Sequence, residues 1–382
     1  MKIKSIILAI LLSLLVNSCS SAQLSSLFGS GDKNSFSLVA VGDICHSHTS
    51  DYVAEFRALG KKKYIPTRKI ISSADLSFAN LETPYTTREP VLEKQFAFAS
   101  DPEELDHILW AGFNLLSLAN NHSHDAGQAG IVDTIELLQK KKRSNRQVRE
   151  PLTWAGTGRT FSEAREPKFI KLPGKNFKIA FLAYGNNSHS LVNTFEVQRA
   201  ANEIQKIKRS DPNTIIIVSV HSGTEYSHVP GSATISYYRT LIDAGAQVIL
   251  GHHPHVLQGI EQYRNGIIFY SLGNFSFGSY TSRHIENDAK LYSMIAKMDF
   301  RRINSTIDIR LVIYPIYVDN VYPMIVNNRK LEPSPFVPQI LQKPFSKPIL
   351  DSIISWSNQI PGNDIRLSSD ETTLNTRIRI DL

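Results

Sequence analysis

Cysteine is scarce in this sequence, which has only Cys19 and Cys45 among its 382 residues. A chain with so few cysteines is not a disulfide-rich scaffold. Internal repeats and low-complexity tracts are lacking as well, which excludes a repeat architecture. A chain of this length can therefore bury one large core or two smaller ones by ordinary packing.

Strong positive charge is also missing. The formal net charge is +7, and it falls to +5 if Lys2 and Lys4 are removed with an N-terminal leader. The densest basic runs are 61–63 and 140–143, and the second follows a stretch with helical spacing, where cations favour the helix carboxyl end. We interpret both runs as solvated faces. This balance permits acidic ligands or anionic lipid surfaces, but it is not a nucleic-acid signature.

The first residues indicate export. Residues 1–18 combine a basic start, an apolar stretch and a small residue before Cys19, which is typical of a secretory signal peptide rather than a membrane span. Residues 15–19 are similar to a bacterial lipobox, which predicts that Cys19 is acylated and anchored at the cell envelope, in the outer membrane or at the cell surface. Residues 19–35 would be a flexible tether, and Cys45 would have no disulfide partner. A cleaved signal with a soluble secreted product is the alternative.

Apolar runs with strand character alternate with stretches that have helical spacing. The strand-like runs are 37–41, 76–79, 114–118, 178–183, 214–220, 248–250 and 266–270. The helix-like stretches are 102–110, 131–139, 200–208 and 236–243. Alternation of this kind predicts an α/β domain with buried strands.

Polar side chains follow most of these strand-like runs directly. They are Asp43, Asn80, Glu82, Asn120, Asn121, His122, His221 and the segment 251–255. Because ligands of open α/β sheets bind outside the carboxyl ends of the strands, we expect these residues to meet in one cleft. Eight of the twelve histidines lie in or next to these clusters, which supports the expectation; they are His46, His48, His122, His124, His221, His252, His253 and His255.

The segment Gly251-His252-His253-Pro254-His255 puts three imidazoles within four positions. An extended chain points residues two apart to the same side, so we expect His253 and His255 to converge just beyond a strand. That arrangement suits a metal ion or an anionic ligand.

Several neighbouring residues have two interpretations. Asp125 either opens a capping box with Gln128 or belongs to the site. His221 is either a buried histidine satisfied by the backbone or a ligand, and Glu225, four residues on, adds a carboxylate that can orient an imidazole from behind. We interpret Cys45 as a small buried hydrophobe and leave it out of the site.

In order and spacing, these motifs resemble the bacterial capsule-synthesis CapA family, also called PgsA. The matching segments are 41–43, 80–82, 120–122 with Asp125, Gly127 and Gly130, 154–159, 221–226, 251–255 and 270–275. The resemblance implies a calcineurin-like metallophosphatase sandwich with mixed sheets flanked by helices, which we place at 36–327. It also implies involvement in making or exporting poly-γ-glutamate, an anionic polymer displayed at the cell surface.

The resemblance to metallophosphatases implies a role for each matching residue. The implied metal ligands are Asp43, Glu82, Asn121, His221, His253 and His255; the implied catalytic residues are His122, as the acid for the leaving group, and Asp43. Supporting or ligand-binding roles fall to Asn80, Asp125, Glu225, His252 and Asn274. Two positions depart from the pattern, because Cys45 stands where a histidine is usual and Glu82 where a bridging aspartate is usual. His46 and His48 are the candidate substitutes, although neither has the usual spacing, and either one ion or a weakly held pair remains open.

Mixed imidazole and carboxylate ligands suit Mn²⁺, Fe²⁺ or Zn²⁺, and a pair of ions can activate water against a phosphoester. Three functions stay open. The protein binds an acidic polymer or its carrier at the cell surface; it is a metal-dependent hydrolase of phosphoesters or envelope bonds; or it is a non-catalytic scaffold that recruits membrane synthase or export subunits.

The end of the chain is less informative. Residues 328–382 are rich in proline at first, include a short helix-like stretch at 349–356 and alternate in polarity at 376–380. We expect a wrapping extension rather than a second domain, and no chemistry is assigned to it.

Overall fold

The computed structural model describes residues 32–48, 53–144, 149–277, 286–318, 322–333 and 336–381. The expected signal peptide, Cys19 and most of the expected tether lie outside these residues. Among the helices of the described ranges, none has both the length and the apolar character needed to cross a bilayer.

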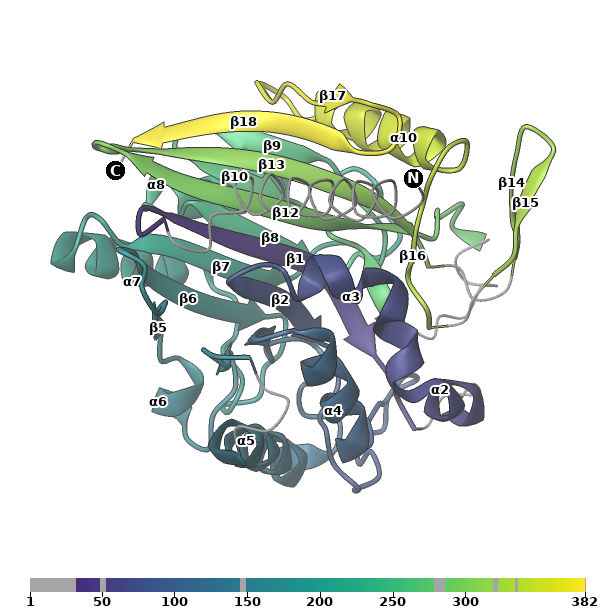
Figure 1. The fold of residues 1–382 in the computed structure, drawn as a ribbon. Coiled ribbons are helices and arrows are strands. Elements are labelled where there is room, and N and C mark those ends of the chain that lie inside the picture. The colour runs from purple at the N-terminus through teal and green to yellow at the C-terminus, as the bar shows by residue number, and fades with distance from the viewer. Residues whose placement is uncertain are drawn as a thin grey trace, which may run out of the picture.

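The larger of two main sheets has ten strands and is mixed (Figure 1). Its main path runs β17 (Ser368–Ser369), β18 (Leu374–Asp381), β13 (Thr306–Tyr317), β12 (Tyr292–Ile303), β1 (Ser35–Cys45), β2 (Leu76–Leu81), β3 (Leu115–Ser117) and β4 (Thr153–Ala155). Two further strands, β11 (Asn274–Phe277) and β16 (Gln339–Ile340), pair with β1 and β13. The strands from β1 to β4 are parallel, whereas β1, β12, β13 and β18 pair antiparallel.

The smaller sheet has six strands and lies behind the first in Figure 1. Its order is β5 (Lys168–Lys171), β6 (Lys178–Gly185), β7 (Ile215–His221), β8 (Val248–His252), β10 (Gly266–Phe269) and β9 (Ile260–Tyr263). The inner strands are parallel and β7 is buried along its whole length, which explains its unbroken apolar sequence. A separate hairpin joins β14 (Met324–Val326) to β15 (Arg329–Leu331).

The two sheets pack face to face around a shared core, and helices cover their outer faces. Across the core, the rings of Phe78 and Phe181 meet edge to face with centroids 5.9 Å apart. The larger sheet is covered by η1 (Gly60–Tyr64), α3 (Ile65–Ile71) and α4 (Pro102–Ala111), and the smaller by α7 (Val197–Ser210) and α8 (Ser232–Asp243). The remaining helices include α2 (Val53–Leu59), α5 (Gly127–Ser144), α6 (Phe161–Ala164) and α10 (Ser346–Asn358). The predicted α/β class, with mixed sheets flanked by helices, is confirmed.

Most predicted elements are found close to their expected positions because their signals are local. For example, α4 begins at Pro102, which suits a first helical position, and ends before Gly112, whose φ of 111° suits a helix terminus. The expected wrapping segment, 328–382, contributes α10 and β18. Since β18 pairs with β13 over eight residues, this segment shares the core of the sandwich.

A close approach of two backbones fixes the end of β1. A Cβ atom added at Gly42 would lie 1.8 Å from the carbonyl oxygen of Gly273. The next amide, that of Asp43, donates to the same oxygen at 2.9 Å, and Asp43 lies beside Asn274 in the register of β1 with β11. Gly42 therefore allows the contact that sets Asp43 against Asn274.

We expect Gly42→Ala to lower the free energy of unfolding by about 3 kcal/mol, because the added methyl group meets backbone rather than a mobile side chain. Urea unfolding of the purified protein measures this. Gly231→Ala is the matched control, since no atom lies within 4 Å of the added Cβ. A loss for Gly42→Ala as small as that of the control would contradict this account.

Candidate functional site

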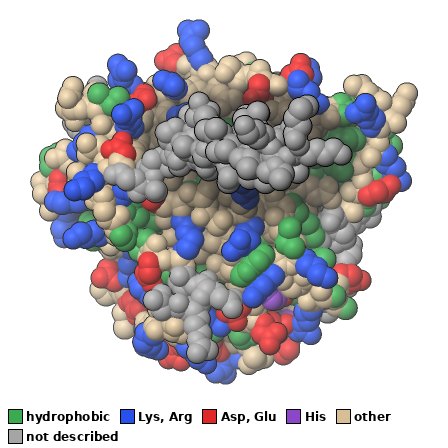
Figure 2. Space-filling view, in the orientation of Figure 1, with side chains coloured by type: hydrophobic (Ala, Val, Ile, Leu, Met, Phe, Trp, Pro, Cys, Tyr) green, Lys and Arg blue, Asp and Glu red, His purple; other side chains and the backbone are tan. Residues whose placement is uncertain are grey.

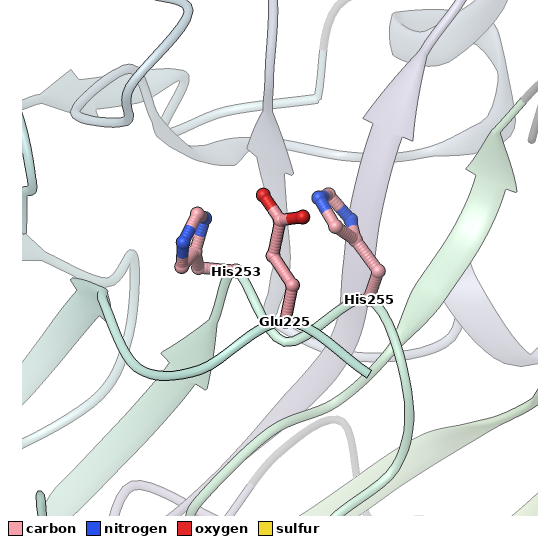
Figure 3. A group of neighbouring side chains, drawn as sticks. All are labelled: Glu225, His253 and His255. Atoms are coloured by element: carbon pink, nitrogen blue, oxygen red, sulfur yellow. The ribbon is translucent and has the colours of Figure 1, made fainter. Parts of the chain in front are cut away.

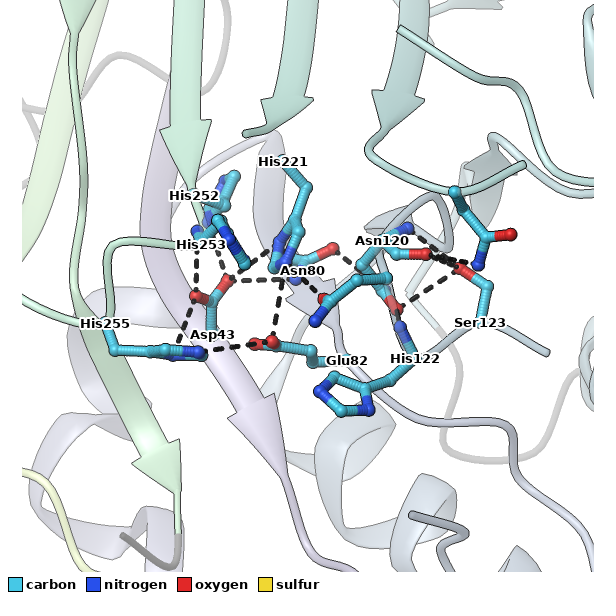
Figure 4. A network of polar contacts seen from close by, with 12 residues as sticks. Asp43, Asn80, Glu82, Asn120, His122, Ser123, His221, His252, His253 and His255 are labelled. Atoms are coloured by element: carbon cyan, nitrogen blue, oxygen red, sulfur yellow. Dashed lines mark hydrogen bonds and ion pairs between the residues drawn. The ribbon is translucent and has the colours of Figure 1, made fainter. Parts of the chain in front are cut away.

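The carboxyl ends of strands from both sheets meet at one place (Figure 4). The larger sheet supplies Asp43 from β1 and Asn80 from β2, together with Glu82 just after β2 and the residues that follow β3. The smaller sheet supplies His221 from β7 and the segment that follows β8. The structure thus brings together the strand-end residues that the sequence predicted. Their roles in binding and catalysis stay predictions.

Asp43, Glu82 and His221 form the first group that could hold a metal ion. One ligand atom from each lies within 4.8 Å of the others, and all three side chains are fully buried. The Oε1 atom of Glu82 is 3.4 Å from Nε2 of His221, and Oδ1 of Asp43 is 4.0 Å from Nδ1 of His221. We call these residues group one.

Group one holds two carboxylates with opposite electrostatic surroundings. Burial alone would raise the pKa of Asp43, but the imidazoles of His252, His221 and His255 lower the pKa below its ordinary value. Nδ1 of His252 lies 2.9 Å from Oδ1 of Asp43, and Asn80 donates to the same oxygen at 2.9 Å. Burial and the neighbouring charge of Asp43 raise the pKa of Glu82 well above its ordinary value.

Glu225, His253 and His255 form a second group, which we call group two (Figure 3). Their ligand atoms also lie within 4.8 Å of one another. Burial, followed by the nearby charge of His255, lowers the pKa of His253 to about 4. The ring is therefore neutral at pH 7, which is the form that binds metals. Nε2 of His255 lies 3.7 Å from Oε1 of Glu82, so the two groups are neighbours.

The way in which His253 and His255 converge differs from the prediction. Strand β8 ends at His252, and His253 and His255 have φ angles of 95° and 59°. The expectation that an extended chain aligns them was wrong, because the chain turns sharply on both sides of Pro254. Such angles are costly for residues other than glycine, and they mark a segment that its surroundings hold in place.

Glu225 lies among the candidate ligands rather than behind an imidazole. It belongs to the loop after β7, and the amide of the next residue, Tyr226, donates to the carbonyl of Pro254 at 2.9 Å. This hydrogen bond ties the loop of Glu225 to the loop of His253 and His255. The spacing of Glu225 from His221 suggested an association between them, but not membership of a second group.

The polar residues expected to support the site also lie in it. Nδ1 of His255 is 3.0 Å from Oδ1 of Asn274, and Nε2 of His221 is 2.8 Å from Oδ1 of Asn121. Asn120 spans two segments, because its side chain donates to the carbonyl of Leu81 at 2.8 Å and accepts from the amide of His122 at 3.0 Å.

His122 and Asp125 form a hydrogen-bonded pair beside these groups. Oδ2 of Asp125 is 2.7 Å from Nδ1 of His122 and accepts from the amide of Phe98 at 2.8 Å. These contacts favour a role for Asp125 in the site over a cap on α5. Burial lowers the pKa of His122, although Asp125 opposes this effect.

Lys94 is a residue that the sequence did not reveal. Its Nζ atom lies 2.6 Å from Oδ1 of Asp125 and 3.2 Å from Nδ1 of His122, and it donates to the carbonyl of Asn121 at 3.1 Å. A single lysine in a long loop carries no periodicity or motif, so its place could not be predicted.

Neither histidine considered as a substitute for the missing one belongs to the two groups. Nδ1 of His46 is 3.1 Å from Oε2 of Glu104, and its Nε2 is 2.8 Å from Oγ of Ser276. His48 lies 3.6 Å from Glu89, measured from Nε2 to a carboxylate oxygen. Cys45 is buried, and burial raises the pKa of its thiol. Glu225 is a further candidate ligand, because it groups with His253 and His255.

Buried polar atoms in both groups test whether these residues fit a metal. Within the described residues, neither carboxylate oxygen of Glu82 nor Nδ1 of His253 has a hydrogen-bond partner of acceptable geometry. Unsatisfied buried groups of this kind are costly and rare. A divalent cation would satisfy them, and mixed imidazole and carboxylate ligands suit Mn²⁺, Fe²⁺ or Zn²⁺. The residues therefore fit a divalent metal, whose identity they leave open.

A two-sheet α/β sandwich with imidazoles and carboxylates at its strand ends has the architecture expected of the metallophosphatase-like class. Residues 37–279 match the family model described as bacterial capsule synthesis protein PGA_cap. The chain belongs to this family, which confirms the resemblance seen in its motifs.

Individual relatives agree with the family match. The "Capsule biosynthesis protein CapA" of Bacillus anthracis is 28% identical over 250 residues, covering 62% of this chain and 56% of that protein. The "PGA biosynthesis protein CapA" of Bacillus subtilis is 31% identical over 251 residues, covering 62% of each. A "Probable polyglutamine synthesis accessory protein" of Mycobacterium tuberculosis is 23% identical over 221 residues, covering 53% of this chain and 56% of that protein. The chain thus spans about three fifths of the length of these relatives.

A solved structure, that of TT1561 of Thermus thermophilus, covers 68% of this chain and 93% of its own at 7% identity. Its TM-score of 0.35 is too low to carry a conclusion about this fold.

We expect Mn²⁺ or Zn²⁺ to raise the melting temperature of the EDTA-treated protein. An ion at 100 times its Kd stabilises the folded state by about 2.7 kcal/mol. Glu82→Gln should leave the metal-free melting temperature nearly unchanged, because glutamine resembles the protonated carboxyl that burial favours, and it should remove most of the metal-induced rise.

Calorimetry with and without added metal measures both quantities. His189→Ala is the control, since His189 stacks on His124 outside both groups and its loss should leave the rise intact. A rise of equal size in Glu82→Gln would show that any bound ion is held elsewhere.

Proposed function

We propose that this protein takes part in the synthesis or export of an anionic capsule polymer such as poly-γ-glutamate. The observation that carries the proposal is the convergence, in one site, of strand-end residues from the part of the chain that matches the capsule-synthesis family. The names of the Bacillus relatives point to the same process. In this proposal the site binds the polymer or its carrier.

The proposal places the protein at the cell envelope, in the outer membrane or at the cell surface. Acylation of Cys19 would hold it there, and the segment up to residue 35 would let the folded part stand off the lipid. Membrane synthase or export subunits are the partners that this location suggests, rather than nucleic acid. The support comes from the sequence of the first residues.

In the proposed mechanism, group one and group two would hold one or two divalent ions. A divalent ion bound there supplies Lewis-acid polarisation of a carboxylate or phosphoryl oxygen. The protein's own residues orient the candidate ligands. Asn80 and His252 orient Asp43 through contacts of 2.9 Å, and Asn274 orients His255 at 3.0 Å. Because these rings and carboxylates are buried, the protein fixes them before any ligand arrives.

Positive charge near the site is local. The face shown in Figure 2 carries Lys and Arg side chains intermingled with Asp and Glu, without a single basic tract. Close to the site, Lys94 is about one-third exposed and touches His122 and Asp125. Lys94 and any bound cation would supply positive charge to an anionic ligand at the site.

A metal-dependent hydrolase of phosphoesters or envelope bonds is the second candidate, and the pair of His122 and Asp125 favours it. When Nδ1 of His122 carries a proton and donates a hydrogen bond to Asp125, Nε2 can first take up a proton and then deliver it. A group with this arrangement can serve as the acid for a leaving oxygen. Activity of the purified protein with Mn²⁺ on a panel of phosphoesters would support this candidate.

We expect deletion of the gene to reduce surface polymer, and a copy carrying His253→Ala to fail to restore it, because His253 belongs to group two. Extraction and quantification of surface polymer, with immunoblotting for protein level, measures the effect. The control copy carries His189→Ala and should restore polymer fully. Unchanged polymer and envelope composition in the deletion strain would refute the proposed function, whereas full restoration by His253→Ala would favour a scaffold that needs no metal.

We expect Cys19→Ser to move the protein from the membrane fraction to the soluble fraction, because the thiol would be the site of acylation. Fractionation and labelling with a fatty-acid analogue measure the change. Cys45→Ser is the control and should keep both label and membrane association, since Cys45 is buried in the fold. Label retained in Cys19→Ser would contradict the lipid anchor.

A further inference from the structure

The loop that carries Glu225 contacts a part of the chain beyond the family match. That match ends at residue 279, whereas α10 spans Ser346–Asn358. The ring of His228, three residues after Glu225, stacks on the indole of Trp356 in α10 with centroids 4.2 Å apart and planes 6° apart. The C-terminal segment therefore reaches the loop that supplies a candidate ligand.

Helix α10 is firmly attached to the smaller sheet close to this stack. The hydroxyl of Ser357 accepts from the amide of Ile260 at 2.9 Å, and the side chain of Asn363 donates to the carbonyl of Ile260 at 2.8 Å. On its inner face, Ile349 and Ile353 are fully buried in the core between the sheets. Trp356 is thus presented from a fixed support.

His228 is held at both ring nitrogens as well as on one face. Its Nδ1 lies 2.8 Å from the carbonyl oxygen of Leu257, and its Nε2 accepts from the amide of Lys290 at 3.0 Å. Because a carbonyl can only accept, Nδ1 carries the proton and the ring is neutral. The polar contacts fix the edges of the ring, and the indole supports its face.

Other contacts of the loop between Glu225 and His228 reach the segment that follows β8, and the ring of Tyr226 lies 6.3 Å from that of His255, centroid to centroid. The amide of Tyr226 donates to the carbonyl of Pro254, and the side chain of Gln258 donates to the carbonyl of Ser227 at 2.7 Å. Both of these partners belong to the segment that also carries His253 and His255. Two contacts of His228 reach beyond that segment: the hydrogen bond from the amide of Lys290, and the stack on Trp356, which ties the loop to α10.

We propose that Trp356 is a positioning residue for group two. Through the ring of His228, it holds the Glu225 loop at the distance from His253 and His255 that group two requires, so the C-terminal segment completes the site. The inference rests on the proposed metal site for its functional consequence, but the positioning itself concerns only the loop. Residues that orient metal ligands without touching the ion commonly affect affinity by about 10- to 100-fold.

The test compares Trp356→Ala with Trp356→Phe and Ile353→Ala in the full-length protein. Ile353→Ala is matched in destabilising α10, since Ile353 is buried in the core, but it leaves the stack on His228 in place. Hydrogen exchange of peptides covering 222–231 reports the loop directly. We expect faster exchange there in Trp356→Ala than in Ile353→Ala. In Trp356→Phe, which keeps an aromatic face against His228, we expect exchange slower than in Trp356→Ala.

Titration with Mn²⁺, followed by calorimetry and elemental analysis, gives the second readout. Glu225→Gln defines the loss expected when group two is damaged. Trp356→Ala should weaken the same binding step by about tenfold or more, and it should leave binding at group one, defined with Glu82→Gln, unchanged.

The outcomes separate the two proposals. Exchange at 222–231 that is no faster in Trp356→Ala than in Ile353→Ala would overturn the positioning role, whatever the metal does. Equal metal affinity in Trp356→Ala and the unaltered protein would overturn its consequence for group two. If the unaltered protein binds no ion but the loop exchanges as expected, the metal site fails and the positioning role stands.

Discussion

Two carboxylates, those of Asp43 and Glu82, are fully buried at the place where both sheets end. Removing a charge from water costs several kcal/mol unless partners compensate it. Asp43 has such partners in His252 and Asn80. Within the described residues, the carboxylate oxygens of Glu82 have no hydrogen-bond partner; two imidazoles lie 3.4 and 3.7 Å away, and the repelling charge of Asp43 outweighs the opposing charge of Lys94. The metal-free site therefore favours a proton on Glu82, and a bound cation can take the place of that proton. The burial of these two carboxylates side by side is the constraint on which the rest of the site depends.

The packing of the two sheets places the carboxylates of Asp43 and Glu82 next to His221, a candidate ligand from the other sheet. Asp43 and Glu82 come from the larger sheet, and His221 comes from β7 of the smaller. Their separation is set by the core between the sheets, where rings such as those of Phe78 and Phe181 interlock. Next to Asp43, the backbone of Gly42 lies so close to that of Gly273 that the end of β1 cannot shift toward it. Group one is thus built on rigid elements, which favours a precise geometry.

The sequence predicted the sheets and group one because both depend on local patterns. Apolar runs mark the strands, and polar residues directly after them mark the strand ends, so Asp43, Glu82 and His221 were found without knowing which strands are neighbours. The rest depended on contacts between segments far apart in sequence. Loop packing leaves no periodic signal in a sequence. It determines the turn at His253 and His255, the contacts of Lys94, and the position of Glu225 among the candidate ligands. The stack of Trp356 on His228 joins residues 128 positions apart in the sequence and could not be foreseen.

Group two differs from group one in that its ligands lie on loops. Tyr226, His253 and His255 all have positive φ angles, each of which costs about 1–3 kcal/mol for a residue other than glycine. Such a conformation persists only when contacts with the surrounding structure hold the backbone in it. Here the surroundings include Asn274, which contacts His255, and α10, which supports His228. Part of this support comes from outside the family-matched residues, because the match ends at residue 279 and α10 spans Ser346–Asn358. In the proposed site, the geometry of group two therefore depends on the surrounding segment as well as on the candidate ligands themselves.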